Sequence, residues 1–172
     1  MIESKNTLID DASLVPNQIL SGEPIYSKAI KKVLASAQHD IKIFDQDLSH
    51  GEFHSLETTK LLHDYLANYQ NNHLTIILQN TDFLKEKCIR LMHLLSIYGH
   101  KITIYETNQT AKHAKDCFII ADSQHYIKRI HIDQARFRFC FNDENNCKLL
   151  DSRFKDLLEE TESTVTITTL GL

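Results

Sequence analysis

His113 and Lys115 are the residues of this sequence whose types and spacing point most directly to chemistry. They lie two positions apart, just before the apolar run 117–121 and Asp122. On an extended chain, residues two apart point to the same side. An imidazole can act as a nucleophile, and a neighbouring ammonium can stabilise the negative charge on a phosphate. The pattern therefore predicts a candidate phosphoryl-transfer site at the start of a strand.

A second candidate site follows the short strand predicted at 41–44, because ligands often bind at the carboxyl ends of strands in open α/β sheets. Two carboxylates and two imidazoles in this loop are suitable ligands for a divalent metal. Gly51, however, interrupts any helix that would place both imidazoles on one face. A solvated loop is therefore the favoured interpretation, with a metal-assisted hydrolase as an alternative. The four residues concerned are Asp45, Asp47, His50 and His54.

A third candidate is a basic run in the second half of the chain. Cations interleaved with aromatic residues are typical of a surface that binds phosphate or single-stranded nucleic acid. The alternative is a strand pair with a solvated charged face, which the acidic balance of the chain favours. The basic residues are Lys128, Arg129, His131, Arg136 and Arg138, and the aromatic residues among and beside them are Tyr126, Phe137 and Phe139.

Composition limits the class of protein. The 172 residues include 42% hydrophobic and 24% charged residues, with a formal net charge of −4. A chain of this kind can bury a core, and it lacks the broad basic field of a dedicated nucleic-acid binder. No apolar run has transmembrane length, and the N-terminus does not resemble a signal peptide. The four cysteines form no CxxC pair and are expected to be free buried thiols in a reducing cytoplasm.

Hydrophobic periodicity predicts helices over 22–39, 56–69 and 82–99, and Pro24 after Gly22 indicates the start of the first. A last helix, capped by Asn145-Asn146, is predicted to bury a stripe of Leu149, Leu150, Phe154, Leu157 and Leu158. Strands are predicted at 41–44, 74–78, 101–105, 117–121, 125–130, 136–141 and 164–168, and Thr7–Ile9 is a possible short strand. In 136–141 the phenylalanines alternate with Arg, Arg and Cys, which predicts a strand that buries its aromatic face. His93 is expected in the core. The expected fold class is α/β, with a mixed, largely parallel central sheet flanked by helices. Residues 1–20 are expected to be an N-terminal extension and 21–172 a single domain.

Three segments carry a resemblance to the phospholipase D-like superfamily, and together they span most of the chain. Residues 29–43 resemble the opening helix and Ile-rich strand of that fold. Residues 115–122 resemble the strand of the His-x-Lys…Asp signature, and 154–161 resemble the end of the C-terminal helix. The resemblance implies a phospholipase D-like fold, and it is closest to uncharacterised, degenerate domains of proteobacteria. Relatives of that kind stand alone or follow an acetyltransferase domain, which makes an acetyltransferase-related partner an expectation from the resemblance alone.

The signature itself departs from the family pattern, in which the Asp lies seven positions after the His. If Asp122 keeps its place, the His position is Lys115 and the Lys position is Cys117, and both catalytic groups are lost. If His113 and Lys115 keep theirs, Asp122 comes two residues late and a bulge is required. The apolar register before Asp122 favours the first alignment.

The sequence therefore predicts a catalytically degenerate phospholipase D-like domain that acts as a binding or interaction module, without a cofactor. The alternative is a phosphodiesterase of nuclease or phospholipase type. Because complete members of the family use two signatures, from one chain or from a homodimer, the resemblance implies a site built across a homodimer. The candidate catalytic residues are His113, Lys115 and Asp122, and the possible ligands are a phosphate-containing molecule or nucleic acid.

Overall fold

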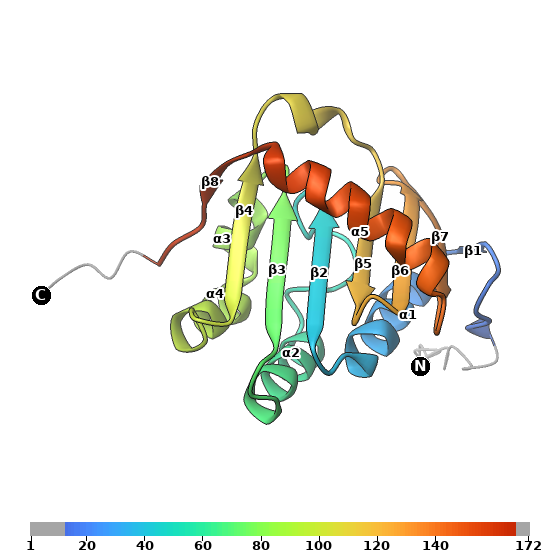
Figure 1. Ribbon diagram of the computed structural model, residues 1–172, viewed down its shortest axis with the longest axis horizontal. Helices are drawn as coiled ribbons and strands as arrows, with labels where there is room; N and C mark the ends of the chain where they lie inside the picture. The colour runs from blue at the N-terminus through green and yellow to red at the C-terminus, as the bar shows by residue number, and fades with distance from the viewer. Residues whose placement is uncertain (1–12, 168–172) are drawn as a thin grey trace, which may run out of the picture.

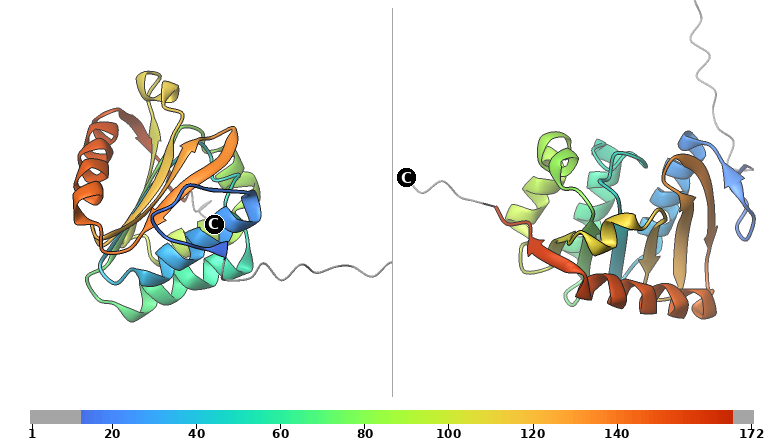
Figure 2. Two further views of the ribbon diagram at one scale, coloured as in Figure 1. Left: turned by 90° about the vertical axis from the view of Figure 1, so that its right-hand side faces the viewer. Right: turned by 90° about the horizontal axis from the view of Figure 1, so that it is seen from above.

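A single eight-stranded sheet between two layers of helices organises the computed structural model, which describes residues 13–167 (Figures 1 and 2). The spatial order of the strands is β1-β7-β6-β5-β2-β3-β4-β8. Their bounds are β1 Leu20–Ser21, β2 Asp40–Asp45, β3 His73–Leu78, β4 Ile102–Thr107, β5 Cys117–Ala121, β6 His125–His131, β7 Gln134–Cys140 and β8 Thr161–Thr164.

Parallel pairing is confined to the three neighbouring strands β2, β3 and β4. Each follows a helix, and a helical crossover returns the chain to the same end of the sheet. The other pairings in the described sheet are antiparallel, including those of β2 with β5 and of β5 with β6. The predicted mixed α/β sheet is therefore confirmed, and its parallel part is limited to these three strands.

The helices lie on both faces of the sheet (Figure 2). One face is covered by α1 (Glu23–Ser36), α2 (Leu56–Asn68), α3 (Asp82–Lys87) and α4 (Ile89–Ile97). The other is covered by α5 (Glu144–Glu159), which runs across the strands. A short 3₁₀ helix, η2 (Thr110–His113), lies in the connection from β4 to β5, which arches over the upper edge of the sheet in Figure 1.

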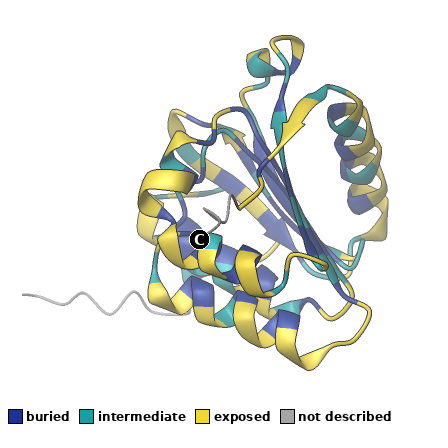
Figure 3. Cartoon of the chain, turned by 90° about the vertical axis from the view of Figure 1, so that its left-hand side faces the viewer, coloured by how far each residue is buried: buried dark blue, intermediate teal, exposed yellow. Residues whose placement is uncertain are grey.

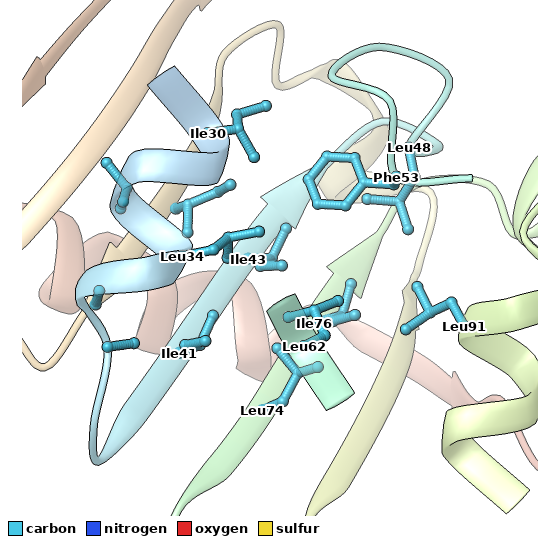
Figure 4. Close-up of a cluster of buried hydrophobic side chains, with 14 of the residues drawn as sticks. Ile30, Leu34, Ile41, Ile43, Leu48, Phe53, Leu62, Leu74, Ile76 and Leu91 are labelled. Atoms are coloured by element: carbon cyan, nitrogen blue, oxygen red, sulfur yellow. The ribbon is translucent and has the colours of Figure 1, made fainter. Parts of the chain in front are cut away.

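Two apolar clusters hold these layers together, because strand residues alternate between the faces. In β2, Ile41 and Ile43 pack toward α1 and α2, whereas Phe44 packs toward α5. Figure 4 shows the larger cluster between the sheet and α1, α2 and α4, and Figure 3 shows that the buried residues lie on the inner faces of the layers. Leu14, within the predicted N-terminal extension, also belongs to this cluster.

Several element boundaries differ from those predicted. The helix predicted over 82–99 is two helices, α3 and α4, because Cys88 leaves the helical conformation between them. The last helix is capped by Asp143, whose carboxylate accepts from the backbone N–H of Asn146, rather than by the two asparagines. The last strand is β8, which ends at Thr164, so the strand predicted over 164–168 is wrong for residues 165–167. Thr168 and the possible strand Thr7–Ile9 lie outside the described residues.

The side chains of the cysteines are all buried and free, as predicted. Between residues 13 and 167, no helix combines the length and the apolar character that crossing a membrane requires.

Candidate functional site

The connection that carries His113 is a helical turn, whereas the sequence predicted an extended chain. Asn108 caps this turn, since its Oδ1 accepts from the backbone N–H groups of Thr110 and Ala111 at 2.9 and 3.3 Å. Gln79, which follows β3, donates from Nε2 to the carbonyls of Ala111 and Ala114 at 2.9 and 2.8 Å. These long-range bonds favour the turn, and the strand begins only at Cys117.

His113 and Lys115 lie at the edge of the sheet where β2, β3 and β4 end and β5 begins, which we call the carboxyl edge. Both residues are exposed. Among residues 13–167, neither side chain has a hydrogen-bond or ion-pair partner, although the backbone carbonyl of Lys115 accepts from the N–H of Ile132 at 2.8 Å. Their catalytic roles stay a prediction.

Asp122 lies at the other end of β5, which is five residues long. An extended segment of that length spans about 16 Å, so Asp122 does not converge with His113 and Lys115 within one chain. Its carboxylate accepts from three consecutive backbone N–H groups, those of Gln38, His39 and Asp40, at 2.8 to 2.9 Å. Asp122 thus joins the end of β5 to the turn between α1 and β2.

Cys117, at the Lys position of the alignment that retains Asp122, is enclosed. Its exposed fraction is 3%, and burial raises the pKa of the thiol far above its ordinary value, an effect increased by the nearby carboxylate of Asp45. Burial likewise raises the pKa of Asp45, and two backbone hydrogen bonds, from Asp47 and Leu48, oppose that shift. A neutral buried thiol cannot supply the positive charge that holds a phosphate.

An ion pair with a buried arginine, Arg129, lies beside Cys117, and sequence reasoning missed it. Arg129, predicted on a basic surface, is only 1% exposed. It donates from both terminal nitrogens to Glu23, at 3.0 and 2.8 Å, and its guanidinium lies 5.0 Å from the ring centre of Tyr26. The prediction that Arg129 is exposed is therefore wrong. Its partner carboxylate lies 106 positions away, so no local pattern in the sequence indicates the pairing.

The residues of the candidate metal loop point to different partners. The Asp45 and Asp47 carboxylates accept backbone N–H groups of the same loop. His50 pairs with Glu23 at 3.3 Å, and the His54 ring packs edge-on against Phe83. Within 13–167, no group of three or more His, Cys, Asp or Glu side chains is arranged to hold a metal ion.

A groove of about 730 Å³ lies beside the carboxyl edge, between β6, β7 and α5. We call it the basic groove, because four cations and, among the described residues, a single carboxylate, Asp116, line it. Arg153 binds Asp116 with two hydrogen bonds of 3.1 and 2.6 Å, and Lys128 lies 3.8 Å from it. The four cations are Lys115, Lys128, Arg138 and Arg153.

Cation repulsion in the basic groove is only partly compensated. Lys128 and Arg138 are direct partners across β6 and β7, and like charges in that position are destabilising. Arg138 donates to the amide oxygen of Asn17 at 3.2 Å. Three residues of the groove lining, Ile19, Ile130 and Leu149, expose large apolar side chains. Leu149 was predicted to lie in the buried stripe of the last helix; that prediction is wrong, because the residue is 70% exposed.

The aromatic residues of the basic run do not form a stacking surface. Phe137 and Phe139 are buried against the α1 side of the sheet, and Tyr126 is buried beneath α5. The alternation that placed both phenylalanines on one buried face is therefore confirmed, whereas their interleaving with the cations on a common surface is not. The groove can hold anionic groups and apolar ones, but it offers no exposed ring for bases to stack on.

Comparison with protein families gives one match, which spans residues 24–170 and so covers most of the chain. The matching model is described as "Domain of unknown function (DUF7931)". The chain belongs to this family. The residues that match DUF7931 include all the helices of the described structure, apart from the first residue of α1. They also include all the lining residues of the basic groove except Ile19. No curated protein matches the chain.

Solved structures with the same fold include the proteins Nuc and NucT and one chromatin protein. Nuc from Salmonella typhimurium, described as a phospholipase D family member, has a TM-score of 0.62 and 12% identity, over 84% of this chain and 96% of Nuc. NucT from Helicobacter pylori has a TM-score of 0.53 and 11% identity, over 84% and 96% of the two chains. The fold of this DUF7931 member is therefore phospholipase D-like.

TrmBL2, an archaeal chromatin protein with a novel mode of DNA binding, has a TM-score of 0.63 and 12% identity over 84% of this chain. The matched region is 52% of TrmBL2, so the present chain spans about half the length of that relative. At these identities the three structures establish a shared fold.

Proposed function

We propose that this chain is a catalytically degenerate phospholipase D-like domain that binds phosphate-containing ligands in the basic groove. The observation that carries the proposal is the groove's charge. It holds four cations and one carboxylate, on a chain whose formal net charge is −4. Positive charges gathered in one region repel one another, which costs electrostatic free energy unless a bound anion offsets the repulsion.

The geometry around the signature supports a binding role in preference to a catalytic one. Cys117 is buried where the aligned signature needs a cation, and Asp122 is occupied by three backbone N–H groups. Lys115, at the aligned His position, lines the groove. The positive charge that remains at the carboxyl edge is thus suited to hold a phosphate, whereas the nucleophile of that alignment is absent.

Nucleic acid is the phosphate-containing ligand with which we would test the groove first. TrmBL2 binds DNA, and the shared fold makes the same ligand class reasonable here. Because the groove exposes aliphatic side chains and no aromatic ring, affinity should come from phosphate contacts and depend strongly on salt.

Reversing two groove charges should weaken binding of a single-stranded 12-nucleotide probe. We expect Lys128→Glu/Arg138→Glu to reduce affinity at least about tenfold at 0.1 M salt, because two phosphate contacts become repulsions. Fluorescence anisotropy over a salt series is the measurement. Lys60→Glu/Arg90→Glu, on α2 and α4, makes the same change of net charge on the other side of the sheet. Equal losses in both variants, or no salt dependence, would contradict a specific groove.

The second candidate is a phosphodiesterase that uses His113 and Lys115 across a homodimer. The observation that favours it is that both side chains are exposed at the carboxyl edge without a partner among the described residues, where a second copy can approach them. In this mechanism His113 is the nucleophile and Lys115 stabilises the charge on the phosphorane.

His113→Ala should abolish hydrolysis of bis(p-nitrophenyl) phosphate if that candidate is correct, since removal of the nucleophile stops the covalent step. The matched control is His100→Ala, an exposed histidine at the opposite end of β4. Hydrolysis by wild type that survives in His113→Ala, or hydrolysis by a strictly monomeric protein, would exclude the mechanism.

A further inference from the structure

A second groove, of about 590 Å³, lies between α2 and α4, on the face of the sheet opposite α5. We call it the helix groove. Each helix contributes a single stripe of residues, at 56, 59, 60 and 63 on α2 and at 89, 90, 93, 94 and 97 on α4. These spacings place every member of a stripe on one side of its helix.

The helix groove exposes a cluster of large aliphatic side chains. Leu56, Ile89 and Ile97 are 66%, 68% and 50% exposed, and Leu94 is buried between the helices at the groove. Single exposed apolar residues are ordinary on a protein surface. Here three of the nine large apolar side chains that the described chain exposes line one depression, which is typical of a surface covered by a partner.

Lys60 and Arg90, in the lining of the helix groove, have charges of one sign, whereas Asp64, outside the lining, lies 3.4 Å from His63. Lys60 and Arg90 line the helix groove, together with His63 and His93, and its described lining includes no carboxylate. His93 was expected in the core and is exposed. Among residues 13–167, Arg90 makes one long hydrogen bond, 3.4 Å, from its guanidinium to the carbonyl of His54. The lysine and arginine charges are therefore available to an anionic partner.

The shape and charge together define the occupant. From Ile89 to Ile97 the groove follows about 12 Å of helix axis, which matches somewhat more than two turns of a third helix packed alongside. A partner helix would present aliphatic residues at i, i+3, i+4 and i+7 to the groove and acidic residues to its flanks. We propose that the helix groove binds an acidic amphipathic helix of a partner protein.

A peptide-display selection with random 16-residue peptides tests this proposal on the whole chain. The selection uses the wild-type protein, with counter-selection against Leu56→Asp/Ile89→Asp. Both positions are the first residue of a helix and are exposed, so a carboxylate there favours the helix dipole and the fold is retained. We expect the enriched peptides to carry aliphatic residues at helical spacing and an excess of Asp and Glu.

The best enriched peptide, made synthetically, then separates the two grooves. We expect at least about tenfold weaker binding to Leu56→Asp/Ile89→Asp and to Lys60→Glu/Arg90→Glu, with an unchanged affinity for Lys128→Glu/Arg138→Glu. The peptide should also gain helical circular dichroism on binding. The proposal is overturned if no peptide is enriched over the counter-selected variant, or if the enriched peptides are basic. It is also overturned if wild type self-associates and Leu56→Asp/Ile89→Asp abolishes that association, because the occupant is then a second copy.

Discussion

Replacing Asp122 with alanine is expected to lower the free energy of unfolding by about 3 kcal/mol, or roughly 1 kcal/mol for each backbone N–H that loses its acceptor. The carboxylate accepts from Gln38, His39 and Asp40, and the N–H of Asp122 itself donates to the carbonyl of Asp40 at 2.8 Å. Denaturant unfolding followed by circular dichroism measures the change.

Asp122→Asn keeps part of this acceptor set in a side chain that the backbone conformation accommodates. One carboxylate oxygen accepts from both His39 and Asp40, and the other accepts from Gln38. The amide keeps one oxygen acceptor, and asparagine tolerates the positive φ of 55° at this position. The loss should therefore be clearly smaller than for alanine. Asp133→Ala, at an exposed carboxylate, is the matched control. Equal stability of Asp122→Ala and wild type would show that the three contacts contribute little.

Replacing Glu23 with alanine is expected to cost about 2 to 3 kcal/mol, because it leaves the Arg129 guanidinium charged and enclosed. The Arg129 side chain is 2% exposed, whereas that of Glu23 is 46% exposed. The two partners are therefore not equivalent. Arg129→Met removes the buried charge and leaves a carboxylate that water can reach, so it should destabilise the protein less than Glu23→Ala. Thermal and denaturant unfolding of both variants gives the order.

The opposite order would show that the other contacts of Arg129 dominate, since its guanidinium also donates to the backbone carbonyls of His131 and Ile132 at 3.2 and 2.7 Å. The difference between wild type and Glu23→Ala should also depend on pH. Hydrogen bonding from Arg129 lowers the pKa of Glu23 below its ordinary value of 4.5. The stabilisation is therefore fully present above pH 4.5 and is lost as the pH falls through the lower folded-state value.

The signature residues show how far sequence reasoning reaches at the candidate site. Counting back from Asp122 identified Lys115 and Cys117 as the aligned positions. In the structure Lys115 lines the basic groove, whereas Cys117 is buried. This alignment could not predict the helical turn at His113. That turn depends on Gln79, which lies 32 to 35 positions away from the carbonyls it binds.

The two grooves were beyond sequence reasoning for a related reason. The basic groove gathers residues from the N-terminal segment, the start of β5, β6, β7 and α5, and Arg153 was not recognised as a member. Its partner Asp116 is 37 positions away. Leu149 follows the spacing of a buried stripe, yet the packing of α5 across β6 and β7 leaves it exposed.

By itself, the sequence determined most of the elements and the class of fold, because both follow from local periodicity. The alternation in 136–141 predicts a strand with buried phenylalanines, and Pro24 after Gly22 predicts the start of α1; both agree with the structure. Only the tertiary structure decided which charges are buried, which are paired and which are left to bind. Those outcomes depend on contacts such as Glu23 with Arg129 and Asp122 with the backbone of 38–40, between residues more than 80 positions apart. Hydrophobic spacing does not indicate such contacts, because the residues that form them come together only after the sheet has formed.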